Sequence, residues 1–323
     1  MTKIINWAIL GPGKIAKKFA LGLEHVPNAN LYAAASRSLD KAKDFAEEMG
    51  ADNAYGSYTE MLNDPEVDAV YVATPHVFHH EHTLLCLKHK KAVLCEKPFA
   101  MNKEQVKEMI NFAQKQDTFL MEAMWTNFLP HFKYTSEIIK SGKYGKVLSM
   151  EADFGFNAPF DPESRIYNKS LGGGSLLDIG IYPIFAALSF LGKPKKIEAT
   201  AEMTKTEVDA RCHATFTYPE NVKAELYSFV DKETDVAATI KLEKAEIYIT
   251  PRFHNPSSVV ITTPTDSFTK EFGVTANGYN FEAEHVGEML RENRKESTDM
   301  TFAKSLELIE TLDQVREKIG LEY

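Results

Sequence analysis

Gly11-Pro12-Gly13-Lys14-Ile15-Ala16 decides the fold of the first part of the chain. This stretch directly follows an apolar run at residues 4–10 and begins a segment with helical spacing. Its G-x-G-x-x-A pattern is typical of a turn that binds the pyrophosphate of a dinucleotide, because Gly11 permits a tight turn and Gly13 lets a phosphate approach the backbone. A strand-to-helix turn without a ligand is the alternative interpretation. The strand and helix on either side favour the dinucleotide, with Pro12, Lys14 and Ile15 beside it.

Outward from this turn, the first third of the chain alternates short apolar runs with amphipathic segments. The apolar runs lie at residues 4–10, 30–35, 67–73, 92–95 and 119–122, and segments with helical spacing lie at 39–49, 79–90 and 103–115. This βαβα order predicts a parallel sheet covered by helices on both faces. We therefore expect a doubly wound Rossmann domain over residues 1–123.

The pattern changes after Trp125. We expect helices at 130–140, 280–294 and 301–319. From residue 147 onward we expect strands whose two faces alternate between apolar and polar side chains, including 210–217, 222–230, 237–242, 245–249 and 259–263. Runs of strands after an alternating half predict an α+β domain with a large, mostly antiparallel open sheet, which we expect over residues 124–323. An open sheet needs its second face covered, so a homodimer or higher homo-oligomer through this sheet is expected.

The charge and cysteine content limit the classes of partner. Lys+Arg 37 against Asp+Glu 46 gives a net charge of −9, and the chain has no block of basic residues. Nucleic acid and anionic membranes demand clustered Lys and Arg, so we expect neither as a partner and favour a small-molecule substrate. Cys86, Cys95 and Cys212 have no C-x-x-C spacing and indicate reduced thiols in a cytoplasmic protein. The apolar run at 171–192 contains Asp178 and is expected to be a buried helix rather than a membrane span.

The residues after the second apolar run indicate which cofactor is read. An NAD enzyme carries Asp or Glu at this position for the ribose 2′-hydroxyl, whereas this chain has Ser36-Arg37-Ser38 followed by Lys41. A guanidinium can pair with a 2′-phosphate, so the sequence favours NADP over NAD. The alternative is that Arg37 and Lys41 are solvated residues at a helix start.

Two further polar segments follow predicted parallel strands. They are Ala73-Thr74-Pro75-His76 and Glu96-Lys97-Pro98. Doubly wound sheets bind ligands at the carboxyl ends of their strands, so both segments are expected at the binding edge. A lysine at a strand end is usually solvated, but here Glu96 can orient Lys97 and Pro98 restricts the chain just beyond it.

Four segments together resemble the Gfo/Idh/MocA family of oxidoreductases, named after glucose-fructose oxidoreductase and myo-inositol dehydrogenase. They are Gly11-Pro12-Gly13, Ala73-Thr74-Pro75, Glu96-Lys97-Pro98, and Gly172-Gly173-Gly174-Ser175-Leu176-Leu177-Asp178-Ile179-Gly180-Ile181-Tyr182. The resemblance covers essentially the whole chain, and the E-K-P segment with the D-x-G-x-[HY] segment is its most specific part. Met121-Glu122-Ala123-Met124-Trp125 and Tyr182 are most similar to the branch of dimeric dihydrodiol dehydrogenases, which also use NADP.

The resemblance implies that the substrate lies between the two domains over the nicotinamide. It implies Lys97 beside the reacting oxygen, Asp178 as an orienting carboxylate and Tyr182 as proton donor or acceptor. An ammonium beside a phenol favours the ionised phenol, which agrees with these roles. Many relatives carry His at position 182, so whether Tyr182 or Lys97 carries the proton stays open. A buried tyrosine hydrogen-bonded to a core aspartate is the alternative interpretation.

Histidines and aromatic residues complete the predicted site. The resemblance implies that His76 touches the cofactor, that His79 supports the cofactor site, and that Trp125, Phe154 and Phe156 are aromatic walls of the pocket. Core packing is the alternative for both phenylalanines. His76, His79, His80, His82 and His89 crowd one region, but no acidic or cysteine partner completes a known pattern, so we expect no metal site.

The sequence thus predicts an NADP-dependent oxidoreductase that interconverts an alcohol and a carbonyl group on a small cyclic diol or sugar-like substrate. An apolar wall suits a cyclic diol, whereas a free sugar would suit a polar wall. An NAD-dependent sugar or inositol dehydrogenase and a non-catalytic NADP-binding regulator are the alternatives. The joint presence of Lys97, Asp178 and Tyr182 favours an enzyme.

Overall fold

A computed structural model describes residues 2–323 and divides the chain into two compact units. The first unit contains the residues up to Trp125 together with Thr275–Leu306, and the second contains Thr126–Val274 with Glu307–Tyr323. The structure therefore divides the chain differently from the expected 1–123 and 124–323. The change of unit lies within two residues of the expected boundary, but Thr275–Leu306 returns to the first unit.

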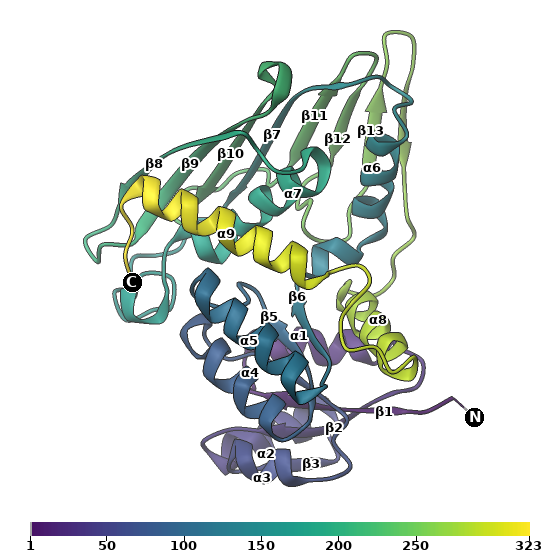
Figure 1. Cartoon of the computed structure of the whole chain (residues 1–323), viewed down its shortest axis with the longest axis vertical. Helices are drawn as coiled ribbons and strands as arrows, with labels where there is room; N and C mark the ends of the chain where they lie inside the picture. Colours follow the sequence, from purple (N-terminus) through teal and green to yellow (C-terminus); the bar gives the residue numbers. More distant parts are fainter. Residues whose placement is uncertain (1) are drawn as a thin grey trace. The chain divides into compact units, whose positions relative to one another are not determined.

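The first unit is built on a six-stranded parallel sheet (Figure 1). The strands follow the order β3 (Asn53–Tyr55), β2 (Ala29–Ala35), β1 (Ile5–Leu10), β4 (Ala69–Val72), β5 (Ala92–Glu96) and β6 (Leu120–Ala123). The chain moves outward in one direction from β1 to β3 and then starts again on the other side with β4. Such a reversal opens a crevice at the carboxyl ends of β1 and β4, where doubly wound sheets bind ligands. The predicted Rossmann fold is confirmed.

Helices accompany this sheet at the predicted places, except that the helix at residues 58–63 was not predicted and the helix at residues 279–291 was expected in the second domain. They are α1 (Lys14–Leu23), α2 (Leu39–Met49), α3 (Tyr58–Asn63), α4 (His79–Lys88), α5 (Lys103–Gln116) and α8 (Tyr279–Arg291), with short 3-10 turns at His76–Phe78 and Trp125–Phe128. α8 joins the first unit because it packs on α1. A Cβ on Gly22 of α1 would lie 2.8 Å from the Cβ of Tyr279, and the Asn277 amide donates to the Lys18 carbonyl at 2.7 Å. Only glycine allows this close approach.

Aromatic rings fill the core of the first unit beneath the glycine turn. Trp7 of β1, Phe19 of α1 and Tyr71 of β4 are fully buried. Phe19 stacks on Tyr71 with ring centroids 3.8 Å apart, and its edge contacts Trp7 at 5.2 Å. Burying such rings stabilises a fold by several kcal/mol, roughly 1.5–3 kcal/mol for each large side chain. This packing holds α1 against the two central strands.

The second unit is built on an eight-stranded, mostly antiparallel sheet. Its order is β14 (Ser267–Lys270), β13 (Val259–Thr262), β12 (Glu246–Ile249), β11 (Ala238–Leu242), β7 (Val147–Gly155), β10 (Lys223–Phe229), β9 (Asp209–Thr217) and β8 (Lys196–Met203). Only β7 and β10 pair in parallel. In β9 the predicted alternation is confirmed, since Cys212, Ala214 and Phe216 are buried while His213 and Thr215 are partly exposed. The edge strands β8 and β14 were not predicted.

Helices pack on one face of this sheet. The second unit contains α6 (Pro130–Lys140), 3-10 turns at Lys169–Leu171 and Pro219–Asn221, a π-helical turn at Leu176–Gly180, α7 (Ile181–Leu191), and most of α9 (Phe302–Ile319). The π-helical turn and α7 lie against β7 and β10 (Figure 1). The stretch Lys169–Leu191 is apolar enough to cross a membrane by length and composition, yet 89% of its apolar window is buried. It is the expected buried helix.

Candidate functional site

The predicted glycine turn lies between β1 and α1, at the crevice of the parallel sheet. Gly11 has φ +92°, and a Cβ there would lie 2.6 Å from the Thr74 Cγ2 atom, so only glycine fits. Gly13 is exposed, and a Cβ there would meet no atom of residues 2–323 within 4 Å. Pro12, Lys14 and Ile15 surround this opening as predicted, and they are partly or largely exposed.

The start of α1, like that of α4, lacks the side-chain cap that three other helices of the same unit have. α2, α3 and α5 are capped by Ser38, Ser57 and Asn102, whose side chains accept hydrogen bonds from the first turn. At α1, Gly13 supplies no cap, no other side chain in the described part of the chain replaces it, and the first turn holds no acidic residue. Its N–H groups and the positive end of the helix dipole are therefore open to an anion. This arrangement fits the pyrophosphate of a dinucleotide.

The end of β2 carries the residues predicted to read the ribose. Arg37 and Lys41 are exposed, and the Ser36 hydroxyl accepts a hydrogen bond from Ser38 N at 3.3 Å. Burial raises the pKa of Tyr58 and lowers that of His82, and the nearby charge of Arg37 opposes the rise for Tyr58 and adds to the fall for His82. Arg37 therefore lies at the crevice edge, in a place that suits a 2′-phosphate.

Tyr58 and His82 form an aromatic corner beside Arg37 that the sequence did not reveal. The edge of one ring meets the other with centroids 4.9 Å apart. His82 Nδ1 lies 3.0 Å from Thr74 Oγ1, which connects this corner to the end of β4. The burial of His82 lowers its pKa, so the ring is neutral near neutral pH. A neutral aromatic corner suits a flat, uncharged ring such as a nucleobase.

His79 joins the ends of β4 and β5. It is fully buried, with Nδ1 2.7 Å from the Pro98 carbonyl and Nε2 2.7 Å from the Thr74 carbonyl. Burial lowers the pKa of His79 to about 4, although both carbonyls favour the protonated ring. The ring of His76 meets His79 edge-on at 5.8 Å. His79 thus links the ends of the two strands from inside the protein. Its support of a cofactor stays a prediction.

Glu96 and Lys97 occupy the end of β5. Glu96 is buried and accepts hydrogen bonds from Lys97 N at 3.1 Å and from the Tyr71 hydroxyl. Glu96 therefore fixes the backbone of Lys97, whose side chain is half-buried. Glu122 on the adjacent strand accepts from Phe99 N at 3.1 Å, and burial raises its pKa to about 7. These buried carboxyls hold the Glu96-Lys97-Pro98 segment in place.

Trp125 of the first unit stacks on another aromatic ring. It is 5% exposed and stacks on Tyr279 with centroids 4.3 Å apart and planes 10° from parallel. Tyr279 starts α8, far along the chain, so no local pattern pointed to it. Both rings are buried, so the stack fixes Trp125 against the start of α8.

In the second unit, the triple glycine leads into the π-helical turn that carries Asp178. Asp178 is 8% exposed and binds Arg165 through two hydrogen bonds of 2.8 and 3.2 Å. Such a bidentate pair fixes the orientation of a carboxylate. Arg165 was not predicted, since it lies in an irregular segment whose pattern says nothing of its neighbours. Single turns of π-helix occur often at functional sites.

Tyr182 lies in the first turn of α7 within a group of aromatic rings. Its centroid is 4.9 Å from that of His254 and 5.6 Å from that of Phe154, and His254 stacks on Phe154 at 4.3 Å. Phe154 therefore borders Tyr182. Phe154 and Phe156 both pack against a small core cluster around Tyr167, which agrees with the core-packing alternative, and their place in a pocket wall stays a prediction. His254 is a neighbour that the sequence did not indicate.

The structure thus assembles two groups of predicted residues. The first unit gathers the glycine turn, Arg37, Lys41, Thr74, Pro75, His76, His79, Glu96, Lys97 and Trp125, and the second brings Asp178, Tyr182 and Phe154 together. The joint action of Lys97 with Asp178 and Tyr182 stays a prediction. Residues 2–323 contain no group of three or more His, Cys, Asp or Glu side chains arranged to hold a metal ion. His80 pairs with Glu108, and His89 lies 2.9 Å from the Leu85 carbonyl.

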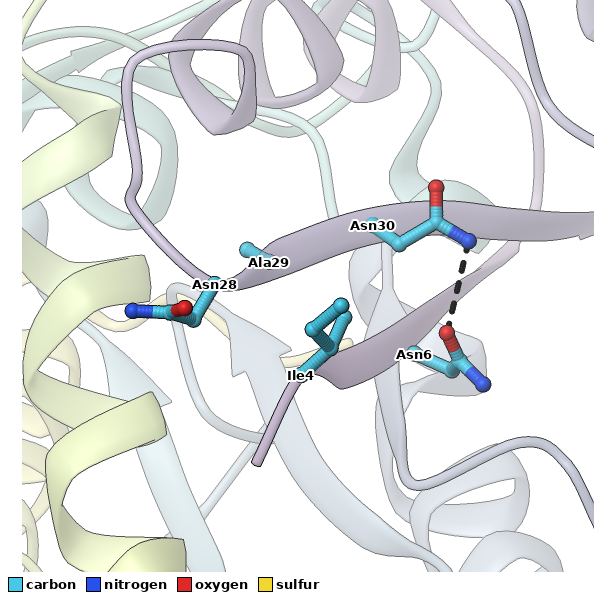
Figure 2. Close-up of a pocket in the computed structure, with 5 residues that line it drawn as sticks. All are labelled: Ile4, Asn6, Asn28, Ala29 and Asn30. Carbon is cyan, nitrogen blue, oxygen red and sulfur yellow. Dashed lines mark hydrogen bonds between the residues drawn. The ribbon is translucent and has the colours of Figure 1, made fainter. Parts of the chain in front are cut away.

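A separate hollow lies at the amino ends of β1 and β2, away from the glycine turn. Figure 2 shows its lining, formed by Ile4, Asn6, Asn28, Ala29 and Asn30. The Asn30 amide donates to Asn6 Oδ1 at 3.3 Å and to Asp52 at 2.9 Å, and Asn6 donates to the Glu66 carbonyl at 3.0 Å. These amides bind one another and the neighbouring backbone, so the hollow is structural.

Comparisons with known proteins match both parts of the chain. Residues 5–124 match the model described as oxidoreductase family, NAD-binding Rossmann fold (GFO_IDH_MocA). Residues 132–248 match the GFO/IDH/MocA C-terminal domain.

Individual relatives align along nearly the whole chain. The trans-1,2-dihydrobenzene-1,2-diol dehydrogenase of Danio rerio is 36% identical, and the alignment covers 99% of this chain and 98% of the relative. That of Mus musculus is 34% identical with the same coverage. Among solved structures, KijD10, a 3-ketoreductase from Actinomadura kijaniata in complex with NADP and TDP-benzene, is 26% identical with a TM-score of 0.87, and 98% of each chain is covered.

Proposed function

This chain belongs to the Gfo/Idh/MocA family of oxidoreductases, and from this premise we propose that it interconverts an alcohol and a carbonyl group with NADP. The substrate we propose is a small cyclic diol or a sugar-like ring. The observation that carries the proposal is the open start of α1 beside Arg37, which suits a dinucleotide with a 2′-phosphate. When bound, NADP supplies or accepts a hydride.

The residues of the first unit bind the cofactor in this proposal. The N–H groups at the start of α1 hold the pyrophosphate, and the open space at Gly13 lets it approach. Arg37 and Lys41 pair with the 2′-phosphate. The 3-ketoreductase that was solved with NADP supports this choice of cofactor.

The residues of the second unit move the proton. During oxidation Tyr182 accepts the alcohol proton, and during reduction it donates that proton to the carbonyl oxygen. We propose that Lys97 acts on the same oxygen and favours the ionised form of the phenol. Asp178, held by Arg165, orients the polar groups around the reacting carbon. The rings of Phe154 and His254 exclude water from the proton transfer.

The aromatic character of these walls favours a cyclic diol over a free sugar. Phe154 and His254 flank Tyr182, and Trp125 stacks on Tyr279 in the other unit. Flat rings suit the faces of an apolar ring and satisfy few hydroxyl groups. The names of the dehydrogenase relatives agree with this substrate class.

We also propose that the chain forms a homo-oligomer in the cytoplasm. The interface we propose is the face of the eight-stranded sheet opposite the π-helical turn and α7. On this face His213 stacks on Tyr227 at 4.4 Å, and Tyr227 stacks on Phe229 at 6.2 Å. These rings are half-exposed, and covering them would bury apolar surface. The three cysteines are free and buried, as suits a reducing compartment. Sedimentation of the wild type and of Tyr227→Glu tests the interface, since only the wild type should associate.

A panel of cyclic dihydrodiols, polyols and dicarbonyls, followed by nicotinamide absorbance, tests the function directly. We expect turnover of at least one cyclic diol or its carbonyl product with NADP, and much weaker turnover with NAD. Turnover of sugars with NAD alone would favour the sugar or inositol dehydrogenase. Tight NADPH binding without any turnover would favour the non-catalytic regulator.

A further inference from the structure

The helix that carries Asp178 and Tyr182 begins at an intrinsically flexible segment. Gly172, Gly173 and Gly174 precede it, and Gly172 and Gly174 have φ of +73° and +109°. Glycine loses more conformational freedom on folding than any other residue. Side chains that act on a substrate must nevertheless stay within a fraction of an ångström of their working positions. The start of this helix therefore needs an anchor.

Asp209 provides that anchor from the first residue of β9. Its Oδ2 atom accepts hydrogen bonds from Ser175 Oγ at 2.6 Å and from Leu176 N at 2.7 Å. A Cβ on Gly174 would lie 2.2 Å from Asp209 Oδ1, so the carboxylate packs directly against the triple glycine. Asp209 is fully buried, and a buried carboxylate is tolerated only where strong donors face it.

Ser228 of β10 reaches both ends of the π-helical turn. Its hydroxyl lies 2.8 Å from Ser175 Oγ at one end, and it is 2.9 Å from the place of a Cβ on Gly180 at the other. The four residues between these contacts include Asp178. A third contact comes from the end of the chain, where the Tyr323 hydroxyl donates to the Gly173 carbonyl at 2.6 Å.

We propose that Asp209 is a positioning residue for the reaction: by holding Ser175 and Leu176, it sets where Asp178 and Tyr182 lie. This inference rests on the proposed function, because it assigns a role in that same site. Asp178 follows Leu176 by two residues, and Tyr182 follows by one further turn, so a shift of the helix start moves both side chains together. Displacements of about 1 Å can lower a rate by roughly a hundredfold.

The charge of Asp209 agrees with this role. Burial raises its pKa to about 6, and the Ser175 hydroxyl and the Leu176 N–H oppose that rise. The carboxylate therefore predominates near neutral pH and accepts both hydrogen bonds. Its titratable neighbours, Cys212 and Tyr323, both have raised pKa values and stay protonated there.

Four variants of the full chain test the proposal. Asp209→Ala removes the acceptor, Asp209→Asn keeps one acceptor oxygen, and Ser175→Ala removes one donor. Thr311→Val is the matched control, because Thr311 is a buried hydroxyl of the same unit that donates within α9 to the Glu307 carbonyl at 2.7 Å. For each variant we would measure kcat, KM, NADPH affinity and amide hydrogen exchange of residues 174–182.

We expect Asp209→Ala to lower kcat about tenfold to a hundredfold while KM and NADPH affinity change less than about twofold. Asp209→Asn should recover most of kcat, and Ser175→Ala should lower it about threefold or more. Amide hydrogen exchange at residues 174–182 should be slowest in Asp209→Asn, faster in Ser175→Ala and fastest in Asp209→Ala. Thr311→Val should leave both kcat and this exchange unchanged.

Other outcomes separate the possible failures. If Asp209→Ala does not fold, the folded Ser175→Ala variant decides, and an unchanged kcat there overturns the proposal. An equal loss of kcat in Thr311→Val also overturns it, since that loss reports general destabilisation. If the wild type turns over no substrate, the proposed function fails. The exchange measurement needs no substrate, and it then shows separately whether Asp209 anchors the turn.

Discussion

The glycine turns at residues 11–13 and 172–174 both lead into a helix. The two helix starts differ in whether a group of the protein binds their N–H groups. α1 begins after Gly13 with no side-chain cap from residues 2–323 and no acidic residue in its first turn. The helical segment after Gly174 meets the buried carboxylate of Asp209, which binds Ser175 Oγ and Leu176 N. One start is open to an anion from outside, whereas the other already holds an anion of the protein.

This difference separates two tasks that an oxidoreductase must perform. A cofactor that binds and leaves needs an exposed turn whose N–H groups become satisfied only in the complex. A side chain that transfers a proton needs a fixed backbone, so its helix start is closed from inside. The same local sequence feature, a glycine turn before a helix, therefore serves opposite purposes in the two units.

Closing the open start should have the largest effect. Gly13 has φ −135° and space for a Cβ, so Gly13→Asp fits the backbone and supplies the missing cap. We expect NADPH affinity to fall about a hundredfold or more, because the carboxylate occupies and repels the phosphate position. The apo protein should be as stable as the wild type or more so. Titration calorimetry with a thermal melt of each apo protein measures both, and unchanged affinity would contradict an open phosphate site.

A larger residue at position 174 should destabilise the second unit. Gly174→Ala places a Cβ against Asp209 at a φ of +109°, and we expect it to lower the free energy of unfolding by about 2–4 kcal/mol. Turnover should fall while NADPH affinity stays within about twofold. Denaturant unfolding and cofactor titration on the same preparation check this. Loss of NADPH affinity as large as the loss of turnover would show that the two starts are not independent.

The pH dependence of stability distinguishes a buried carboxylate from an open one. Because the pKa of Asp209 in the folded chain is about 6, above the value near 4 of an unfolded chain, the folded protein binds more protons between these values. Its contribution to the free energy of unfolding therefore decreases as the pH rises through this window, by about 3 kcal/mol in total. Asp209→Asn has no carboxyl group to titrate at this position. The free energy of unfolding of the wild type minus that of the variant should therefore decrease from pH 4 to about pH 6 and then stay constant. A pH-independent difference would contradict the raised pKa.

The smallest effect should come from the residue that reads the ribose at the edge of the open start. Arg37→Asp should weaken NADP about tenfold or more while changing NAD affinity little, because only NADP carries the 2′-phosphate. Competitive titrations with both nucleotides measure the ratio. Arg37→Gln serves as the control for loss of charge without reversal, and it should lie between wild type and Arg37→Asp. An unchanged ratio in both variants would mean that Arg37 does not read the phosphate.

The first unit could be predicted from the sequence in detail because its signals are local. The glycine turn, the alternation of strand and helix and the residues at strand ends all lie within about 125 residues of sequence that form one sheet. Even here, β3 has only three residues and gave no periodic signal. The sequence analysis placed α8 in the second domain, whereas it belongs to the first unit. Its packing on α1 depends on Gly22 and Tyr279, which lie far apart in the sequence.

In the second unit the sequence predicted the helices at 130–140 and 301–319, most of the strands and the helix that carries Asp178 and Tyr182, but not the contacts that position this last helix. Arg165, His254 and Asp209 reach that helix from irregular segments or distant strands, and a single sequence contains no pattern for such contacts. The π-helical turn likewise depends on packing rather than on residue spacing. Phe154 and Phe156, which the resemblance placed in the pocket wall, both pack against the core cluster around Tyr167.

The central claim is that Tyr182 transfers the proton in an NADP-dependent reaction whose cofactor is held by the other unit. Single-turnover oxidation of NADPH by a carbonyl substrate, followed in the wild type and in Tyr182→Phe, tests it most directly. Tyr182→Phe keeps the ring beside Phe154 and His254 and removes only the hydroxyl. We predict a rate at least about a hundredfold lower with unchanged NADPH affinity. A wild-type rate in this variant would contradict the account.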